Sequence, residues 1–119
     1  IDLWTKVGGF SEEFNPGDGS DPDLNMKLWK EGVRIFKGVS SSRVYHFGSI
    51  TTRKNKKIIP NKGKKTFLLK WKITVEFFTK HYLKRGSIFD GPLNNPNKNF
   101  IYYYDFFIVQ FKYFIAKLI

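Results

Sequence analysis

The sequence lacks cysteine altogether and has only one methionine and two histidines. Without cysteine, disulfides and thiolate metal sites are excluded, and the composition fits a reducing compartment, so we expect a cytoplasmic location. No signal peptide is visible, because the first residues show no basic segment followed by an apolar one. The chain starts without Met inside a patterned segment, which predicts that further sequence precedes it.

Acidic residues are scarce as well, with ten Asp and Glu against 21 Lys and Arg, which gives a net charge of +11. The imbalance is local: residues 1–50 are nearly neutral, whereas residues 53–72 carry nine Lys and Arg and no acid. A basic block beside a neutral segment indicates a polyanionic neighbour, namely a diphosphate, a nucleic acid or an anionic membrane, unless the block is only a solvated loop.

Apolar residues, by contrast, are plentiful enough for one small domain. The 119 residues are 41% hydrophobic, which excludes wholesale disorder, and they are too few for two independent cores. Aromatic residues gather in residues 99–119, where 16 of 21 residues are apolar. Asp105, Gln110, Lys112 and Lys117 interrupt this tail. We therefore expect a helix that makes peripheral contact with a membrane or packs on another domain, rather than one that crosses a membrane.

A helix with clear start and stop signals is predicted over residues 21–31. Asp21 is a good N-cap, a proline follows it, and Gly32 supplies the C-terminal stop. Ser20 with Asp23 offers an alternative capping-box register. Either register places a carboxylate at the start of the helix.

Two further patterns predict strands and a long helix. Alternation of apolar and polar residues predicts half-buried strands at residues 33–37 and 43–47. Apolar residues that recur every three or four positions predict one continuous helix over residues 65–85. The mixture indicates an α/β fold.

Several polar residues offer the parts of a group-transfer site. A carboxylate at a helix N-terminus, such as Asp21, stays ionised and can deprotonate an attacking hydroxyl. His46 can bind a divalent metal, and Arg53 and Lys54 can neutralise a departing diphosphate. Taken alone, Asp21 is most simply a helix cap, and a histidine on a strand, such as His46, is more often packed or hydrogen-bonded than a metal ligand.

The order of these residues resembles a signature of family 2 glycosyltransferases. Members carry a Gly-Gly-Phe-Asp-Glu-x-Phe segment, a loop, Glu-Asp-x-Asp-Leu, a basic residue three positions later and a helix-ending Gly. The matching residues are Gly8-Gly9-Phe10-Ser11-Glu12-Glu13-Phe14, then Ser20-Asp21-Pro22-Asp23-Leu24, then Lys27 and Gly32.

The resemblance implies glycosyl transfer with inversion at the sugar carbon and a GT-A fold, a Rossmann-like α/β sandwich of which this chain would be the C-terminal half. It makes Asp21 the general base. Ser20 stands where the family usually has Glu, so the role of that first acid is lost or has moved to Asp18. The residues implied in acceptor binding are Gly8, Gly9, Phe10, Asp18 and Asp23. The implied partners are a nucleotide-sugar donor, a glycan or lipid-linked acceptor, and a divalent metal, Mg²⁺ or Mn²⁺.

A second segment, Val44-Tyr45-His46-Phe47-Gly48-Ser49, resembles the part in which some members place a His near metal and diphosphate. It implies a metal site at His46 and diphosphate contacts at Ser49, Arg53 and Lys54. The nucleotide-binding half of the family is missing from the 119 residues, so we interpret the chain as a fragment that is inactive alone. The expected divisions are the C-terminal part of the catalytic domain at 1–63, a following helix at 64–86, a linker at 87–98 and an aromatic helical tail at 99–119.

The alternative is a non-enzymatic basic module that binds nucleic acid or an anionic membrane surface. Phe67 and Trp71 interleave with the cations of residues 53–72, as in modules that stack nucleotide bases. This alternative leaves the acidic, glycine-rich loop at 15–23 unexplained. We therefore rank it second and do not expect a nucleic acid partner.

Overall fold

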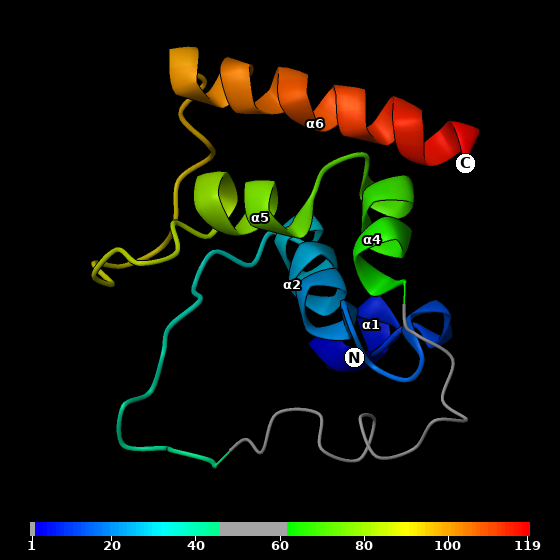
Figure 1. Cartoon of the computed structure of the whole chain (residues 1–119). Helices are drawn as coiled ribbons and strands as arrows, with labels where there is room; N and C mark the ends of the chain where they lie inside the picture. The colour runs from blue at the N-terminus through cyan, green and yellow to red at the C-terminus, as the bar shows by residue number, and fades with distance from the viewer. Residues whose placement is uncertain (1, 46–61) are drawn as a thin grey trace.

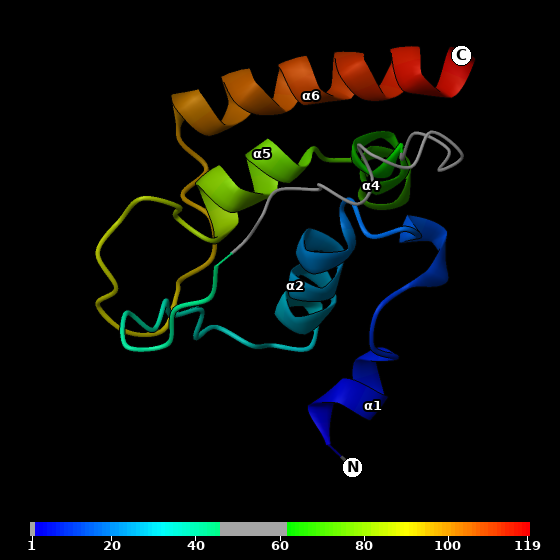
Figure 2. The same cartoon turned by 60° about the horizontal axis from the view of Figure 1, so that its bottom comes forward.

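The computed structural model describes residues 2–45 and 62–119, and every regular element in these ranges is helical. Figure 1 shows α6 lying across one end of the molecule, α4 and α5 beneath it, and α2 and α1 further away. The turned view of Figure 2 places α2 between α1 and the pair α4 and α5. The elements are α1 (Leu3–Val7), a 3₁₀ turn η1 (Glu12–Phe14), α2 (Ser20–Lys30), α4 (Gly63–Trp71), α5 (Val75–Phe77), a π-helical turn η2 (Phe78–Tyr82) and α6 (Phe100–Leu118).

The predicted α/β fold, and with it the partial GT-A architecture, is wrong for the described residues. Neither 33–37 nor 43–45 forms a strand, and residues 46 and 47 lie outside the described ranges. The segment after α2 is held by other contacts. The Arg34 guanidinium donates a hydrogen bond of 2.7 Å to the carbonyl of Trp29 and lies 3.9 Å from the centre of the Trp29 ring. The N–H of Leu93 donates a hydrogen bond to the Arg34 carbonyl. The Arg34 carbonyl therefore accepts from Leu93 and not from a partner strand.

Helix α2 forms where the sequence predicts it, one residue early at both ends. Its N-cap is Gly19, which offers no side-chain cap, so Asp21 lies inside the first turn instead of capping it. Gly32 ends the helix as predicted, because its N–H donates to Trp29 and the N–H of Val33 donates to Leu28, closing the last turn.

The predicted helix over 65–85 is broken into α4 and the α5–η2 pair. Lys72 takes a left-handed backbone conformation, with φ of 59°. Thr74 then starts a new helix, because its side chain accepts a hydrogen bond of 3.1 Å from the N–H of Phe77. Gln110 of α6 donates to the exposed Lys72 carbonyl at 3.0 Å. The apolar spacing continues across the break, so the sequence pattern alone did not reveal it.

The core lies where α2, α4, α5 and η2 meet beneath α6. Phe14, Phe67 and Phe78 are at most 1% exposed and are its most deeply buried apolar side chains. Gly63 brings the start of α4 directly against the loop before α2: a Cβ on Gly63 would lie only 1.9 Å from the Asp18 carbonyl oxygen. Only glycine permits this approach, which joins the two halves of the chain.

Helix α6 confirms the predicted helical tail. The Asn99 side chain caps it by accepting 3.0 Å from the N–H of Tyr102. Asp105 links α6 to η2. Its carboxylate accepts a hydrogen bond of 2.6 Å from the Lys80 ammonium and lies 2.8 Å from the Nε2 atom of His81. Among the helices in residues 2–45 and 62–119, none is long and apolar enough to cross a membrane.

Candidate acceptor site at the start of helix α2

The centre of the candidate site is the carboxylate of Asp23, which is completely buried. One oxygen accepts a hydrogen bond of 2.8 Å from the indole N–H of Trp71 and lies 2.9 Å from the Lys70 ammonium nitrogen. The other oxygen accepts a hydrogen bond of 2.8 Å from the Ser11 hydroxyl and lies 3.5 Å from the Lys27 ammonium nitrogen. Buried charges are tolerated when they are paired and hydrogen-bonded in this way.

The same contacts set the ionisation of the carboxylate. Burial alone would raise the pKa of Asp23, but hydrogen bonds from Lys70, Ser11 and Trp71 and the charge of Lys70 outweigh it, so the pKa lies below its ordinary value. For Lys70, burial would lower the pKa, yet the carboxylates of Glu13 and Asp23 raise it. The pair is therefore charged across the physiological range, and Asp23 acts as a fixed internal anion.

Lys27 joins this anion to the Gly-Gly-Phe turn. Its ammonium donates 3.0 Å to the Gly9 carbonyl, in addition to its contact with Asp23. Gly9 is buried with a φ of +58°, and a Cβ there would come within 2.7 Å of the Trp4 ring. The turn therefore needs glycine at this position for both backbone conformation and space.

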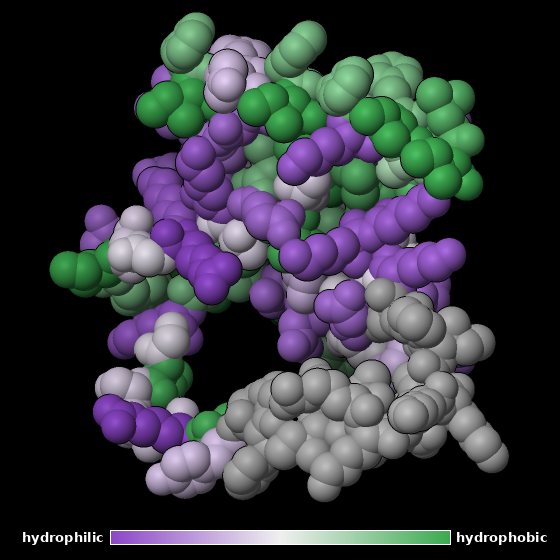
Figure 3. Space-filling model, viewed as in Figure 1, coloured by the Kyte–Doolittle hydropathy of each residue, from purple (hydrophilic) through white to green (hydrophobic). Residues whose placement is uncertain are grey.

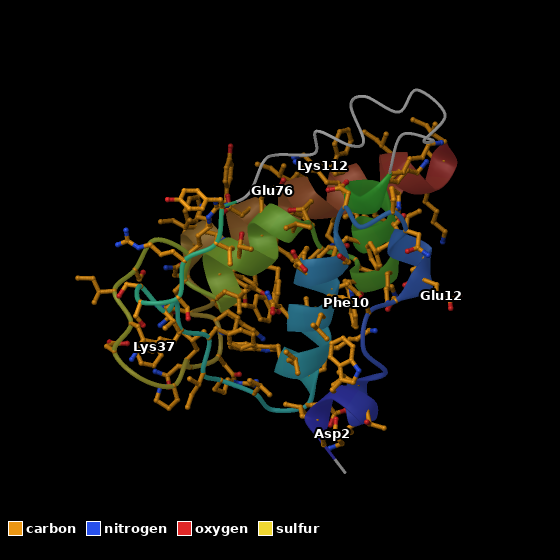
Figure 4. All side chains as sticks on the ribbon, turned by 90° about the horizontal axis from the view of Figure 1, so that it is seen from below. Asp2, Phe10, Glu12, Lys37, Glu76 and Lys112 are labelled. Atoms are coloured by element: carbon orange, nitrogen blue, oxygen red, sulfur yellow. The ribbon has the colours of Figure 1, made fainter. Side chains whose placement is uncertain are left out.

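Phe10 follows the turn and is presented at the surface. Its ring makes an edge contact with Trp4 at a centroid distance of 5.3 Å, and 53% of the residue remains exposed. Figure 4 shows Phe10 beside α2, with Glu12 further along on the side of η1. An exposed aromatic ring held in this way can stack on the apolar face of a sugar.

The predicted base, Asp21, lies one position before the proline of the first helical turn and is exposed. Asp18 in the preceding loop and Gly8 in the turn are exposed too. In the first turn of α2, the N–H of Ser20 donates to the Gly17 carbonyl and residue 22 is a proline without an N–H, while the positive end of the helix dipole lies at this turn. Asp21 and Phe10 are thus surface groups on two segments that Ser11, Asp23 and Lys27 hold together.

Asp23, in contrast, offers no surface to a ligand. The sequence placed it with the acceptor-binding residues, but its carboxylate is internal and all its oxygen positions have partners. The structure gives it a supporting role instead. Burial is the physical reason, because the helix period places Asp23 on the same inward face as Met26 and Trp29.

Four other predicted residues fall outside the described ranges: His46, Ser49, Arg53 and Lys54. Their roles in metal and diphosphate binding stay predictions. Within residues 2–45 and 62–119, no group of three or more His, Asp or Glu side chains is placed to hold a metal ion. The described residues therefore do not supply a ligand set for the divalent metal that the resemblance implies.

Sequence reasoning missed the partners of Asp23. Lys70 and Trp71 come from α4, and Trp71 lies 48 positions further along the chain. No local pattern predicts such a pairing. One signal was present: Ser11 replaces the acid usual in the family, and a hydroxyl can donate to a neighbouring carboxylate, whereas a second carboxylate would repel it.

Comparison with known proteins adds no family to this geometry. No protein-family model matches the chain, and neither the curated proteins nor the solved structures give a match.

Proposed function

We propose that this chain supplies the acceptor side of an inverting glycosyltransferase, in which Asp21 is the general base. One observation carries the proposal. The two segments that resemble the family signature are bonded to each other, through Ser11 to Asp23 at 2.8 Å and through Lys27 to Gly9 at 3.0 Å. This arrangement leaves Asp21 and Phe10 at the surface while the groups that hold them are internal.

The chemistry follows from a carboxylate fixed on a rigid element. An acceptor hydroxyl attacks the anomeric carbon of a nucleotide sugar, and its proton passes to a carboxylate oxygen of Asp21 as the new bond forms. The bond from the sugar to the nucleotide diphosphate breaks at the same carbon, so the configuration inverts. Attack and departure on opposite faces of the sugar require the base and the leaving group to lie on opposite sides.

The other residues have supporting roles in this proposal. In the proposal, Phe10 provides an apolar surface for the acceptor sugar, and Asp18 is assigned a polar contact with the acceptor. Asp23 holds the turn and the helix in register and does not touch substrate. Donor binding is assigned to none of the described residues, because the only Asp-x-Asp in the sequence is the one at 21–23, which the proposal uses on the acceptor side.

The nucleic-acid alternative gains no support from its two aromatic residues. Phe67 is 0% exposed, and the Trp71 indole N–H donates to Asp23. Phe67 therefore presents no ring for stacking on a base, which is how aromatic side chains bind single strands, and Trp71 is only partly exposed. The membrane part of that alternative rests on the cations of residues 53–72, and residues 53–61 of that block lie outside the described ranges.

The test is a transfer assay with the full-length protein that contains this chain. A panel of nucleotide sugars is incubated with saccharide and lipid-linked acceptors, and NMR reports the anomeric configuration of the product. We expect a glycoside with inverted configuration. A retained configuration, or donor hydrolysis that no acceptor hydroxyl can replace, would contradict the proposal.

A further inference from the structure

Helix α6 has two apolar faces, and only one of them is used inside the molecule. Tyr102 and Val109 are buried against the core, with Phe106 and Tyr113 packed around them. The opposite face is 56–87% exposed and consists of Phe100, Tyr103, Tyr104, Phe107, Phe111, Phe114 and Leu118, here called the outer stripe. The space-filling view in Figure 3 shows hydrophobic side chains along the edge formed by α6.

The outer stripe runs along the whole helix. Its members recur every three or four residues, so they share one side of α6. With 19 residues, α6 is about 28 Å long, and the stripe extends over that length. A continuous aromatic face of this size marks an interaction surface, whereas single exposed apolar residues do not.

Lysines flank the outer stripe on both sides. At 100° per residue, Lys112 lies to one side of Phe111, and Lys117 lies to the opposite side of Leu118. Both lysines are exposed. An apolar face bordered by cations is the arrangement of a helix that lies in a membrane interface, where the rings enter the acyl boundary and the ammonium groups meet phosphates.

A basic pocket opens beside the same helix. It has a volume of about 450 Å³, and Lys64, Lys65 and Lys112 line it together with the apolar side chains of Leu68 and Ile115. Its acid, Glu76, is paired with Lys64 at 3.2 Å. Figure 4 shows Glu76 and Lys112 on the same side of the molecule. Lysines around an apolar floor suit the phosphate and upper acyl chain of an anionic lipid.

We propose that the outer stripe of α6 docks on an anionic phospholipid surface, with the helix parallel to it. Charge decides between this occupant and a second copy of the chain. Two copies would bring together two net charges of +11, whereas an anionic bilayer complements them. The inference goes beyond glycosyl transfer and does not depend on it.

The test measures binding of the full-length protein to vesicles at about 0.15 M salt. Vesicles of phosphatidylcholine with 30% phosphatidylserine are compared with vesicles of phosphatidylcholine alone. The outer-stripe variant is the double substitution Phe107→Ser and Phe111→Ser, and the flank variant is Lys112→Gln with Lys117→Gln. A matched control is Tyr45→Ser with Ile88→Ser, because those side chains are also exposed, at 94% each, but lie away from α6.

We expect binding to the anionic vesicles, at least tenfold weaker for the outer-stripe variant, severalfold weaker for the flank variant and unchanged for the control. A second variant, Phe107→Trp, tests the same contact with a conservative change. Brominated lipids should quench its added fluorescence. Three results would overturn the inference: no binding to anionic vesicles, binding that the outer-stripe variant leaves unchanged, or a dimer that this variant dissociates in the absence of vesicle binding.

Discussion

The indole N–H of Trp71 donates a 2.8 Å hydrogen bond to the buried carboxylate of Asp23, across 48 positions of sequence. This bond ties α4 to the inner face of α2, and Ser11 and Lys27 tie the Gly-Gly-Phe turn to the same helix. The packing of the two segments that carry Asp21 and Phe10 therefore depends on an internal anion.

Removing the buried anion should destabilise the fold. In Asp23→Ala, the Ser11 hydroxyl and the Trp71 indole lose their acceptor, and Lys70 keeps a charge without its buried partner. We expect a loss of about 3 kcal/mol in the free energy of unfolding. Urea unfolding followed by circular dichroism measures it. Asp21→Ala, an exposed carboxylate on the same helix, is the control and should change the value by less than about 0.5 kcal/mol. Equal effects at both positions would contradict this role for Asp23.

Stability should fall at both extremes of pH because of the same pair. The folded-state pKa of Asp23 is lowered, so its stabilisation is complete above the unfolded value of about 3.9 and is lost as pH falls through the folded pKa. The folded-state pKa of Lys70 is raised, so its stabilisation is complete below about 10.4 and is lost as pH rises through the folded pKa. Urea unfolding midpoints measured from pH 2 to pH 12 should fall at the acidic end, the acid limb, and also at the alkaline end. In Asp23→Asn the acid limb should be visibly shallower, and an unchanged limb would refute the assignment.

The close approach of α4 to the loop before α2 predicts a strong effect at a single glycine. Gly63→Ala would place a methyl group 1.9 Å from the Asp18 carbonyl oxygen, so the helix must shift away. We expect a cost of about 2 kcal/mol, measured as a lowered midpoint of thermal unfolding. Gly38→Ala is the matched control, because a Cβ at Gly38 meets no atom within 4 Å. A neutral Gly63→Ala would show that the two segments are not in contact.

Lys27 should act as a positioning residue for the turn. Lys27→Met leaves the Gly9 carbonyl without its donor, so the turn and Phe10 are less firmly held. In the full-length protein we expect kcat for transfer to fall about tenfold, with little change in KM for the nucleotide sugar. Lys30→Met, an exposed lysine at the end of the same helix, should behave like the wild type. If KM for the donor rises instead, Lys27 belongs to donor binding.

The elements that were predicted correctly are those that neighbouring residues in the sequence determine. The helix at α2 and its end at Gly32 follow from residues adjacent in sequence, and so does the aromatic helix α6. The strand predicted at 33–37 failed because alternation does not specify a pairing partner. Here Arg34 is held by its guanidinium bond to Trp29 and by one backbone bond from Leu93, and no strand forms at 33–37.

In the candidate site, too, the features set by neighbouring residues were predicted and those set by tertiary contacts were not. The order of the motifs predicted that the segment of Gly9 and Phe10 and the start of α2 belong to one unit, and the bonds from Ser11 to Asp23 and from Lys27 to Gly9 join these segments, but the burial of Asp23 was not predicted. Its partners in α4 are brought close only by tertiary packing, and the break at Lys72 that shapes α4 lies inside an uninterrupted helical pattern. A charge with distant partners is therefore read from sequence as a surface group.

The most direct measurement of the central claim is the transfer rate of Asp21→Asn in the full-length protein, with nucleotide-sugar affinity measured in parallel. The amide keeps the size of the side chain but cannot accept the proton of the acceptor. We predict a fall in kcat of about a thousandfold with donor affinity within about twofold of wild type, while Asp90→Asn, an exposed carboxylate elsewhere, leaves both unchanged. Turnover of Asp21→Asn at the wild-type rate would contradict the account.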